Sequence, residues 1–71
     1  MARINKRQRE AIYNILRSSN NYLVRERAHI ILAWNRNIKK YLIANSFDKN
    51  IDFIETVISD FKATGISSLN C

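Results

Sequence analysis

The chain is 71 residues long, enough for one small domain but not for two, because each domain needs a core of its own. Hydrophobic residues make up 46% of it and charged residues 25%, a composition that excludes disordered and fibrous classes. Twelve Lys and Arg residues against six Asp and Glu give a net charge of +6, so contact with a polyanion is favoured.

Several residue types that other protein classes require are scarce. One Gly and no Pro leave few turn residues for a β-sheet, which predicts helices joined by short polar connections. A single Cys, at position 71, and a single His argue against a disulfide framework and against a metal site. No apolar run approaches the roughly 20 residues of a membrane span and no signal-peptide pattern is present. The sequence therefore predicts a cytoplasmic protein without membrane contact, nucleoid-associated if it binds DNA.

Apolar residues recur three or four positions apart in four stretches, which predicts four amphipathic helices and an all-α fold. The predicted helices cover residues 5–17, 22–34, 38–46 and 51–64 of a single domain, 1–71. Asn5 and Asn50 stand where they can cap the first and fourth helices. Gly65 suits the left-handed position after a helix end, so residues 66–69 are expected to pack back as a tail.

The same spacing predicts which side chains form the core. The second helix has an apolar face broad enough for a central position, made of Leu23, Val24, Ala28, Ile31, Leu32 and Trp34. The fourth helix has a narrower apolar stripe, made of Ile54, Val57, Ile58 and Phe61. Aromatic residues that follow these stripes are predicted to be core residues rather than platforms for stacked bases.

Charge is divided unevenly along the chain. Residues 1–40 hold ten basic and two acidic side chains, a net charge of +8, whereas residues 41–71 hold two basic and four acidic ones, a net −2. A basic half favours phosphate contact, although a solvated basic surface that maintains solubility has the same composition.

The predicted third and fourth helices are short, are separated by about four residues and follow a longer buried helix. This is the outline of a helix-turn-helix, in which the second helix of the pair enters the major groove. Many such turns use Gly, and Asp48 stands at that place here; Asp tolerates the left-handed conformation better than most residues. Many small helical bundles share this outline.

Four stretches add a family likeness to the outline: RERAHIILA (25–33), NIKKYLIA (37–44), IETVISDF (54–61) and GISSL (65–69). They resemble the N-terminal helix-turn-helix region of insertion-sequence transposases allied to the mariner superfamily, over nearly the whole chain. The resemblance implies a homeodomain-like fold that binds double-stranded DNA. Phe61 and Gly65 match the family pattern directly, and Asn50 replaces its usual capping Ser.

The chain departs from the family on the exposed side of the recognition helix. Positions that are commonly basic in the family are Ile51, Asp52, Glu55 and Thr56 here. Carboxylates repel phosphates, so the resemblance implies the fold more strongly than it implies sequence-specific reading. The family's carboxylate triad, which binds two metal ions, belongs to a later domain that 71 residues cannot include. No enzymatic activity and no cofactor are therefore predicted.

The DNA-binding interpretation assigns a role to each candidate side chain. Phosphate contacts are assigned to Arg25, Arg27, Arg36, Lys39, Lys40 and Lys49, with Asn37 beside them. Base contacts are assigned to Asn50, Asp52, Thr56 and Phe53. Lys39 and Lys40 oppose the macrodipole at a helix start, a local conflict that favours a function. The basic arm around Arg3 has two interpretations, minor-groove contact or a frayed terminus.

A second interpretation comes from another class of protein. The same fold, reused as an inhibitor or adaptor, would bind a protein partner through its acidic and partly apolar fourth helix. Charge reversal at Lys39 and Lys40 would abolish DNA binding under the first interpretation. Reversal at Asp52 and Glu55 would abolish partner binding under the second.

Overall fold

Asparagine side chains begin three of the four α-helices in this computed structural model, which describes residues 3–70. Asn5 caps α1 (Lys6–Ser18) in a reciprocal capping box, in which its side chain and that of Gln8 each accept from the other's backbone N–H. Asn21 caps α2 (Tyr22–Asn35), and Asn50 caps α4 (Ile51–Thr64) by accepting from the Phe53 N–H at 2.9 Å. The predicted capping roles of Asn5 and Asn50 are confirmed.

The all-α class with four helices is confirmed, and residues 3–70 contain no strand. The fourth helix has the predicted bounds, whereas α3 (Lys40–Phe47) begins two residues later than predicted. Asn37 adopts a left-handed conformation with φ of 63°, and Lys39 is extended, so the chain enters the helix only at Lys40. A 3-10 helix, η1 (Gly65–Asn70), follows α4. Cys71 lies outside the described residues.

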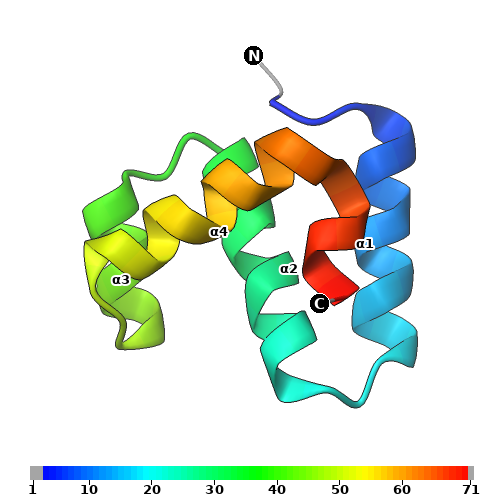
Figure 1. Cartoon of the computed structure of the whole chain (residues 1–71), viewed down its shortest axis with the longest axis horizontal. Coiled ribbons are helices and arrows are strands. Elements are labelled where there is room, and N and C mark those ends of the chain that lie inside the picture. Colours follow the sequence, from blue (N-terminus) through cyan, green and yellow to red (C-terminus); the bar gives the residue numbers. More distant parts are fainter. Residues whose placement is uncertain (1–2, 71) are drawn as a thin grey trace.

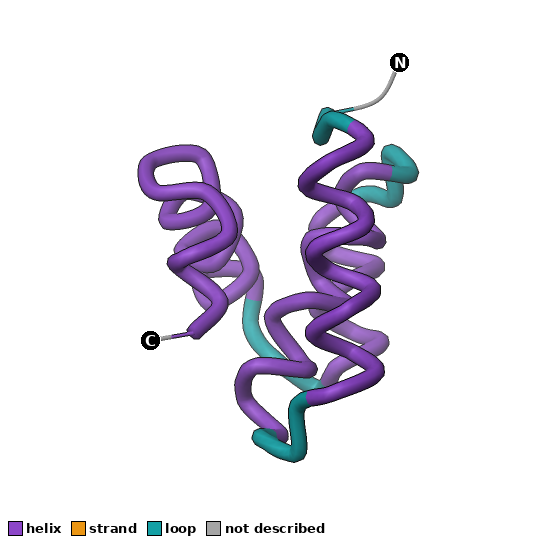
Figure 2. The backbone as a smooth tube through the Cα atoms, turned by 90° about the vertical axis from the view of Figure 1, so that its right-hand side faces the viewer, coloured by secondary structure: helices purple, strands orange, loops and turns teal. Residues whose placement is uncertain are grey.

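The second helix is the centre of the fold. It packs against α1, α3, α4 and η1, whereas α1 packs only against α2 and η1 among the described elements. Figure 1 shows α4 crossing in front of α2, with η1 returning towards α1. The loops between the helices are short (Figure 2). This arrangement places α3 and α4 together at one side of α2, joined by the connection of residues 48–50.

The core gathers isoleucine side chains from all four helices. The largest fully buried side chains are Ile12, Ile30, Ile31, Ile43, Ile54 and Leu69. The four core residues predicted in α4 are all buried, and the buried Leu69 shows that the tail packs back as predicted. Leu23 was predicted to be buried but is 51% exposed, although Val24 beside it in the first turn of α2 is buried. Ile30 is buried although the predicted apolar stripe omits it, since α2 is covered on several sides.

An ion pair with a buried carboxylate ties the connection between α3 and α4 to α2. Glu26 on α2 is only 4% exposed, and its Oε2 accepts a hydrogen bond of 3.2 Å from the Tyr22 hydroxyl. Its Oε1 lies 3.7 Å from the Lys49 ammonium and has no hydrogen-bond partner in the described part of the chain. The same ammonium lies 5.3 Å from the centre of the Phe53 ring. Lys49 therefore helps to fix where α4 begins.

Candidate nucleic-acid interface

The candidate phosphate ligand Arg25 closes the end of α1. Its guanidinium donates to the carbonyl of Leu16 and, at 3.4 Å, to that of Ser19. The last carbonyls of a helix lack intrahelical donors and carry the negative end of the macrodipole, so a cation is favourable there. Both contacts use one terminal amino group, Nη1, and they give Arg25 a structural role that the sequence did not predict.

Two further predicted phosphate ligands have carboxylate partners. Lys49 pairs with the buried Glu26, as described above. The Lys40 ammonium lies 3.7 Å from a carboxylate oxygen of Glu55, and both side chains are about half exposed. An exposed pair of this kind is worth less than about 1 kcal/mol, so a phosphate can replace Glu55 as the partner of Lys40.

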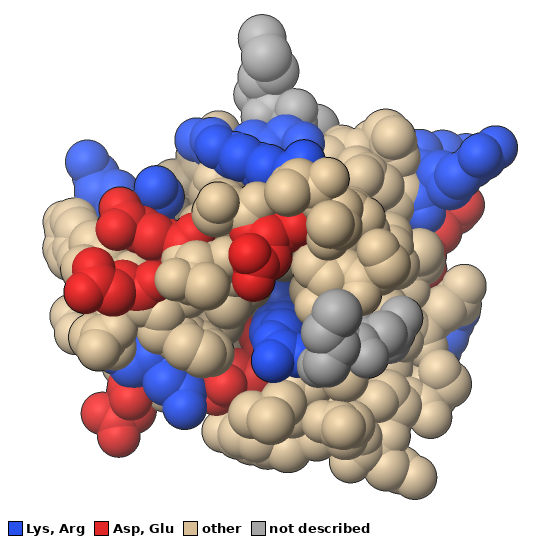
Figure 3. All heavy atoms as spheres, in the orientation of Figure 1, with Lys and Arg blue, Asp and Glu red and all other residues tan. Residues whose placement is uncertain are grey.

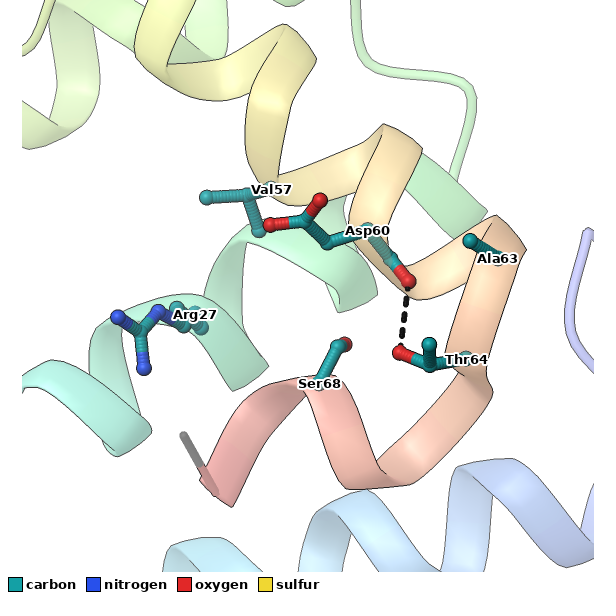
Figure 4. A pocket seen from close by; sticks show the side chains of 6 residues that line it. All are labelled: Arg27, Val57, Asp60, Ala63, Thr64 and Ser68. Atoms are coloured by element: carbon teal, nitrogen blue, oxygen red, sulfur yellow. Dashed lines mark hydrogen bonds between the residues drawn. The ribbon is translucent and has the colours of Figure 1, made fainter.

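Arg27 faces a different part of the molecule from α3. It lines a cavity of about 250 Å³ between α2, α4 and η1 (Figure 4). Val57, Asp60, Ala63, Thr64 and Ser68 form the remaining wall, and the Thr64 hydroxyl donates to the Asp60 carbonyl at 3.0 Å. Arg27 is therefore grouped with the C-terminal part of the fold rather than with Lys39 and Lys40.

The remaining basic candidates come together where α2 gives way to α3. Arg36 caps the end of α2, Lys39 precedes the first residue of α3, and both are exposed together with Asn37 between them. No carboxylate of residues 3–70 lies within 4.0 Å of either cation. We call this group (Arg36, Asn37 and Lys39) the basic corner.

Arg3 lies against the basic corner. Its backbone N–H donates to Asn35 Oδ1 at 2.8 Å, and its side-chain Nε donates to Asn37 Oδ1 at 3.1 Å. Arg3 is thus held by side chains at and just after the end of α2. Figure 3 shows Lys and Arg side chains as a broken band along the upper edge of the molecule.

The predicted base-contacting residues lie on α4, where acidic groups dominate. Asn50 uses its side-chain oxygen as the helix cap, and Phe53 is partly buried beside Lys49. Asp52 and Thr56 are exposed, and they line a shallow groove with Glu55, Ser59 and Asp60. Figure 3 shows acidic side chains over α4. We call Asp52, Glu55 and Asp60 the acidic face.

Lys62 is a further basic residue of this surface, and no pattern in the sequence identifies it as a candidate. It lies in the last turn of α4, and its ammonium is 5.4 Å from the centre of the Trp34 ring. Lys62 and Trp34 are far apart in the sequence and on different helices, so only the packing of α4 on α2 brings them together. No spacing rule within one helix could have identified this contact.

Comparison with known proteins adds no assignment: no family model, no curated protein and no solved structure matches the chain. Among residues 3–70, no three His, Cys, Asp or Glu side chains are grouped so that they could hold a metal ion. No helix in that range is both long and apolar enough to cross a membrane.

Proposed function

We propose that this chain is a DNA-binding module in which α3 and α4 form a helix-turn-helix that grips duplex DNA mainly through phosphates. The observation that carries the proposal is the basic corner, an exposed pair of cations at the α2–α3 junction with no carboxylate of residues 3–70 within 4.0 Å. The resemblance to the helix-turn-helix region of mariner-allied transposases supports the same conclusion. The Glu26–Lys49 pair supports it further, because it joins the α3–α4 connection to α2.

The local geometry is compatible with this mode of binding. Asp48 adopts the left-handed conformation, with φ of 57° and ψ of 44°, and turns the chain between the two helices as the sequence predicted. In helix-turn-helix proteins the first helix crosses the DNA backbone while the start of the second reaches base edges. Lys39 and Lys40, at the start of α3, would then lie near phosphates.

The acidic face limits how α4 can contribute. Asp52 and Glu55 occupy the first two turns of α4, the part of a recognition helix that approaches the bases. Carboxylates accept hydrogen bonds from cytosine but repel the surrounding phosphates. The module should therefore show phosphate-dominated affinity with weak base selectivity.

The direct test is fluorescence anisotropy with a labelled random-sequence duplex of about 25 base pairs, titrated between about 50 and 200 mM salt. A module that grips about four phosphates gives a slope of log K against log salt near −4. Lys39→Glu should weaken binding at least about tenfold at low salt, whereas Arg17→Glu should have little effect. Arg17 is a matched control because it is exposed at the opposite end of α1 from Arg3. Absence of binding at low salt would refute the proposal.

A second candidate function is supported by the surface of α4. The acidic face adjoins Ile51, which is 43% exposed at the first position of the helix. An acidic helix with a half-exposed apolar end suits a basic protein partner better than a phosphate backbone. If the duplex titration shows no binding, the Asp52→Lys, Glu55→Lys double variant and the wild type should be compared as baits. Selective loss of one specific protein from the variant would support this function.

A further inference from the structure

Two cations converge on one indole ring. The Arg3 guanidinium carbon lies 5.1 Å from the centre of the Trp34 ring, and the Lys62 ammonium lies 5.4 Å from it. Both distances are within the range of a cation–π contact. The three residues come from the N-terminal segment, the end of α2 and the last turn of α4. Tertiary packing, rather than local sequence, therefore creates the group.

Arg3 is held in place by neutral groups. Asn35 Oδ1 accepts from the backbone N–H groups of Arg3 and Ile4, at 2.8 and 3.1 Å, and Asn37 Oδ1 accepts from Arg3 Nε. These contacts use the Nε–H and leave both terminal amino groups of the guanidinium without a protein partner among residues 3–70. Arg3 is therefore anchored at its Nε and keeps its two terminal amino groups available as donors.

The two positive charges have no nearby counter-ion within the described part of the chain. No carboxylate of residues 3–70 lies within 4.0 Å of Arg3 or Lys62. Like charges that share one ring repel each other, and the ring quadrupole offsets this only in part. An anion that touches both cations would remove the repulsion. This feature is a local conflict in the isolated chain, of the kind that marks functional sites.

We propose that Arg3 and Lys62 form a phosphate clamp over Trp34 that binds one phosphodiester of a nucleic-acid backbone. This inference rests on the proposed DNA-binding function and deepens it. A guanidinium with two available terminal amino groups can donate to two phosphate oxygens, and a lysine ammonium supplies a third contact as a point charge. The clamp adjoins the basic corner through the Arg3–Asn37 hydrogen bond, so it extends the phosphate-binding surface to the end of α4.

Trp34 provides a specific signal for the test, because it is the only Trp in the chain. Its emission is recorded during titration with the random-sequence duplex and, separately, with inorganic phosphate against chloride at the same ionic strength. The proposal requires a saturable change with the duplex. It also requires that Arg3→Gln and Lys62→Gln each lower duplex affinity about three- to tenfold and reduce the salt slope by about 1.

Three controls separate the clamp from the total charge and from folding. Arg17→Gln removes one exposed positive charge at a distance and should change duplex affinity less than about twofold. Lys62→Arg keeps the charge and should retain the wild-type affinity. Circular dichroism confirms that each variant is folded. If the Arg3→Gln and Lys62→Gln variants bind like Arg17→Gln, the clamp is refuted while the proposed DNA-binding function stands.

The phosphate titration keeps the two proposals distinguishable when no duplex binding occurs. In that case the proposed function fails. A Trp34 response to inorganic phosphate that both Gln variants abolish would then support a clamp for free phosphate. A Trp34 emission that phosphate leaves unchanged, together with no duplex binding, would refute the clamp as well.

Discussion

Glu26 and Lys49 differ in how deeply their side chains are buried, and this difference determines how much each contributes to the stability of the fold. The Glu26 side chain is 2% exposed, whereas the Lys49 side chain is 34% exposed and can reach water if its partner is removed. A buried charge without a partner is far more costly than an exposed one. The pair is therefore expected to stabilise the fold chiefly by keeping the Glu26 carboxylate compensated.

Lys49→Met should destabilise the protein more than Glu26→Gln does. The first change leaves a buried carboxylate with only the Tyr22 hydroxyl, which we expect to cost about 3 kcal/mol. The second leaves a neutral amide beside a lysine that can turn to solvent, and should cost about 1 kcal/mol. Urea denaturation measures both values, with Lys6→Met as the exposed control. Equal losses for the two variants would show that the pair is not asymmetric.

Substitutions at Asp48 measure the free-energy cost of its left-handed backbone conformation. Its left-handed conformation, with φ of 57°, costs most residues about 1–2 kcal/mol relative to Gly. Asp48→Ala should therefore lower the free energy of unfolding by about 1 kcal/mol, while Asp48→Gly should leave it unchanged or raise it slightly. Thermal denaturation compares the two variants. A loss for Gly as large as that for Ala would mean that the Asp48 side chain, rather than its conformation, stabilises the turn.

At the scale of the helix, α3 differs from its neighbours in how it begins. Asparagine side chains cap α1, α2 and α4, but Lys39 at the N-cap of α3 makes no capping hydrogen bond. The helix also has no acidic residue in its first turn. Lys39 at the N-cap and Lys40 at the first position oppose the helix macrodipole, so α3 is less stable locally than a helix that begins with a capping side chain. The phosphate binding that we propose would account for cations at this position.

Lys39→Ser should therefore separate stability from binding. A serine cap satisfies a free N–H at the start of α3 and should raise the free energy of unfolding by about 0.5–1 kcal/mol. The same change removes one cation of the basic corner and should weaken duplex binding severalfold at low salt. Asn50→Ala is the reverse control for stability, because loss of that cap should cost about 1 kcal/mol. If Lys39→Ser gains stability without losing affinity, Lys39 does not contact phosphate.

The elements that local chemistry governs were predicted well. Apolar spacing and asparagine caps gave all four helices, with α4 at its observed bounds, and Asp48 was placed in its left-handed conformation. The predicted start of α3 was wrong because Asn37 is a second left-handed residue, a conformation that Asn tolerates as Asp does but that the spacing of apolar residues does not reveal. The partners of Arg25 and Lys49 could not be predicted, because both contacts join segments that meet only after the helices pack.

Across the whole molecule, the uneven charge of the sequence becomes two surfaces of opposite sign. The basic corner at the α2–α3 junction lies near the acidic face of α4, since Lys40, the residue after Lys39, pairs with Glu55. Opposite charges so close together reduce the field that a duplex experiences on approach. Net charge alone therefore overstates the affinity, since some of the cations are neutralised within the fold.

Glu55→Gln should strengthen duplex binding and reveal how much of this neutralisation is local. The change releases Lys40 and removes a negative charge, so affinity should rise about three- to tenfold near 50 mM salt, with a salt slope steeper by about 1. Asp60→Asn removes the same charge from the same helix but no partner of Lys40. Anisotropy titrations should therefore show a smaller gain for it. Equal gains would mean that only the overall field matters, while no gain for either would place the DNA away from α4.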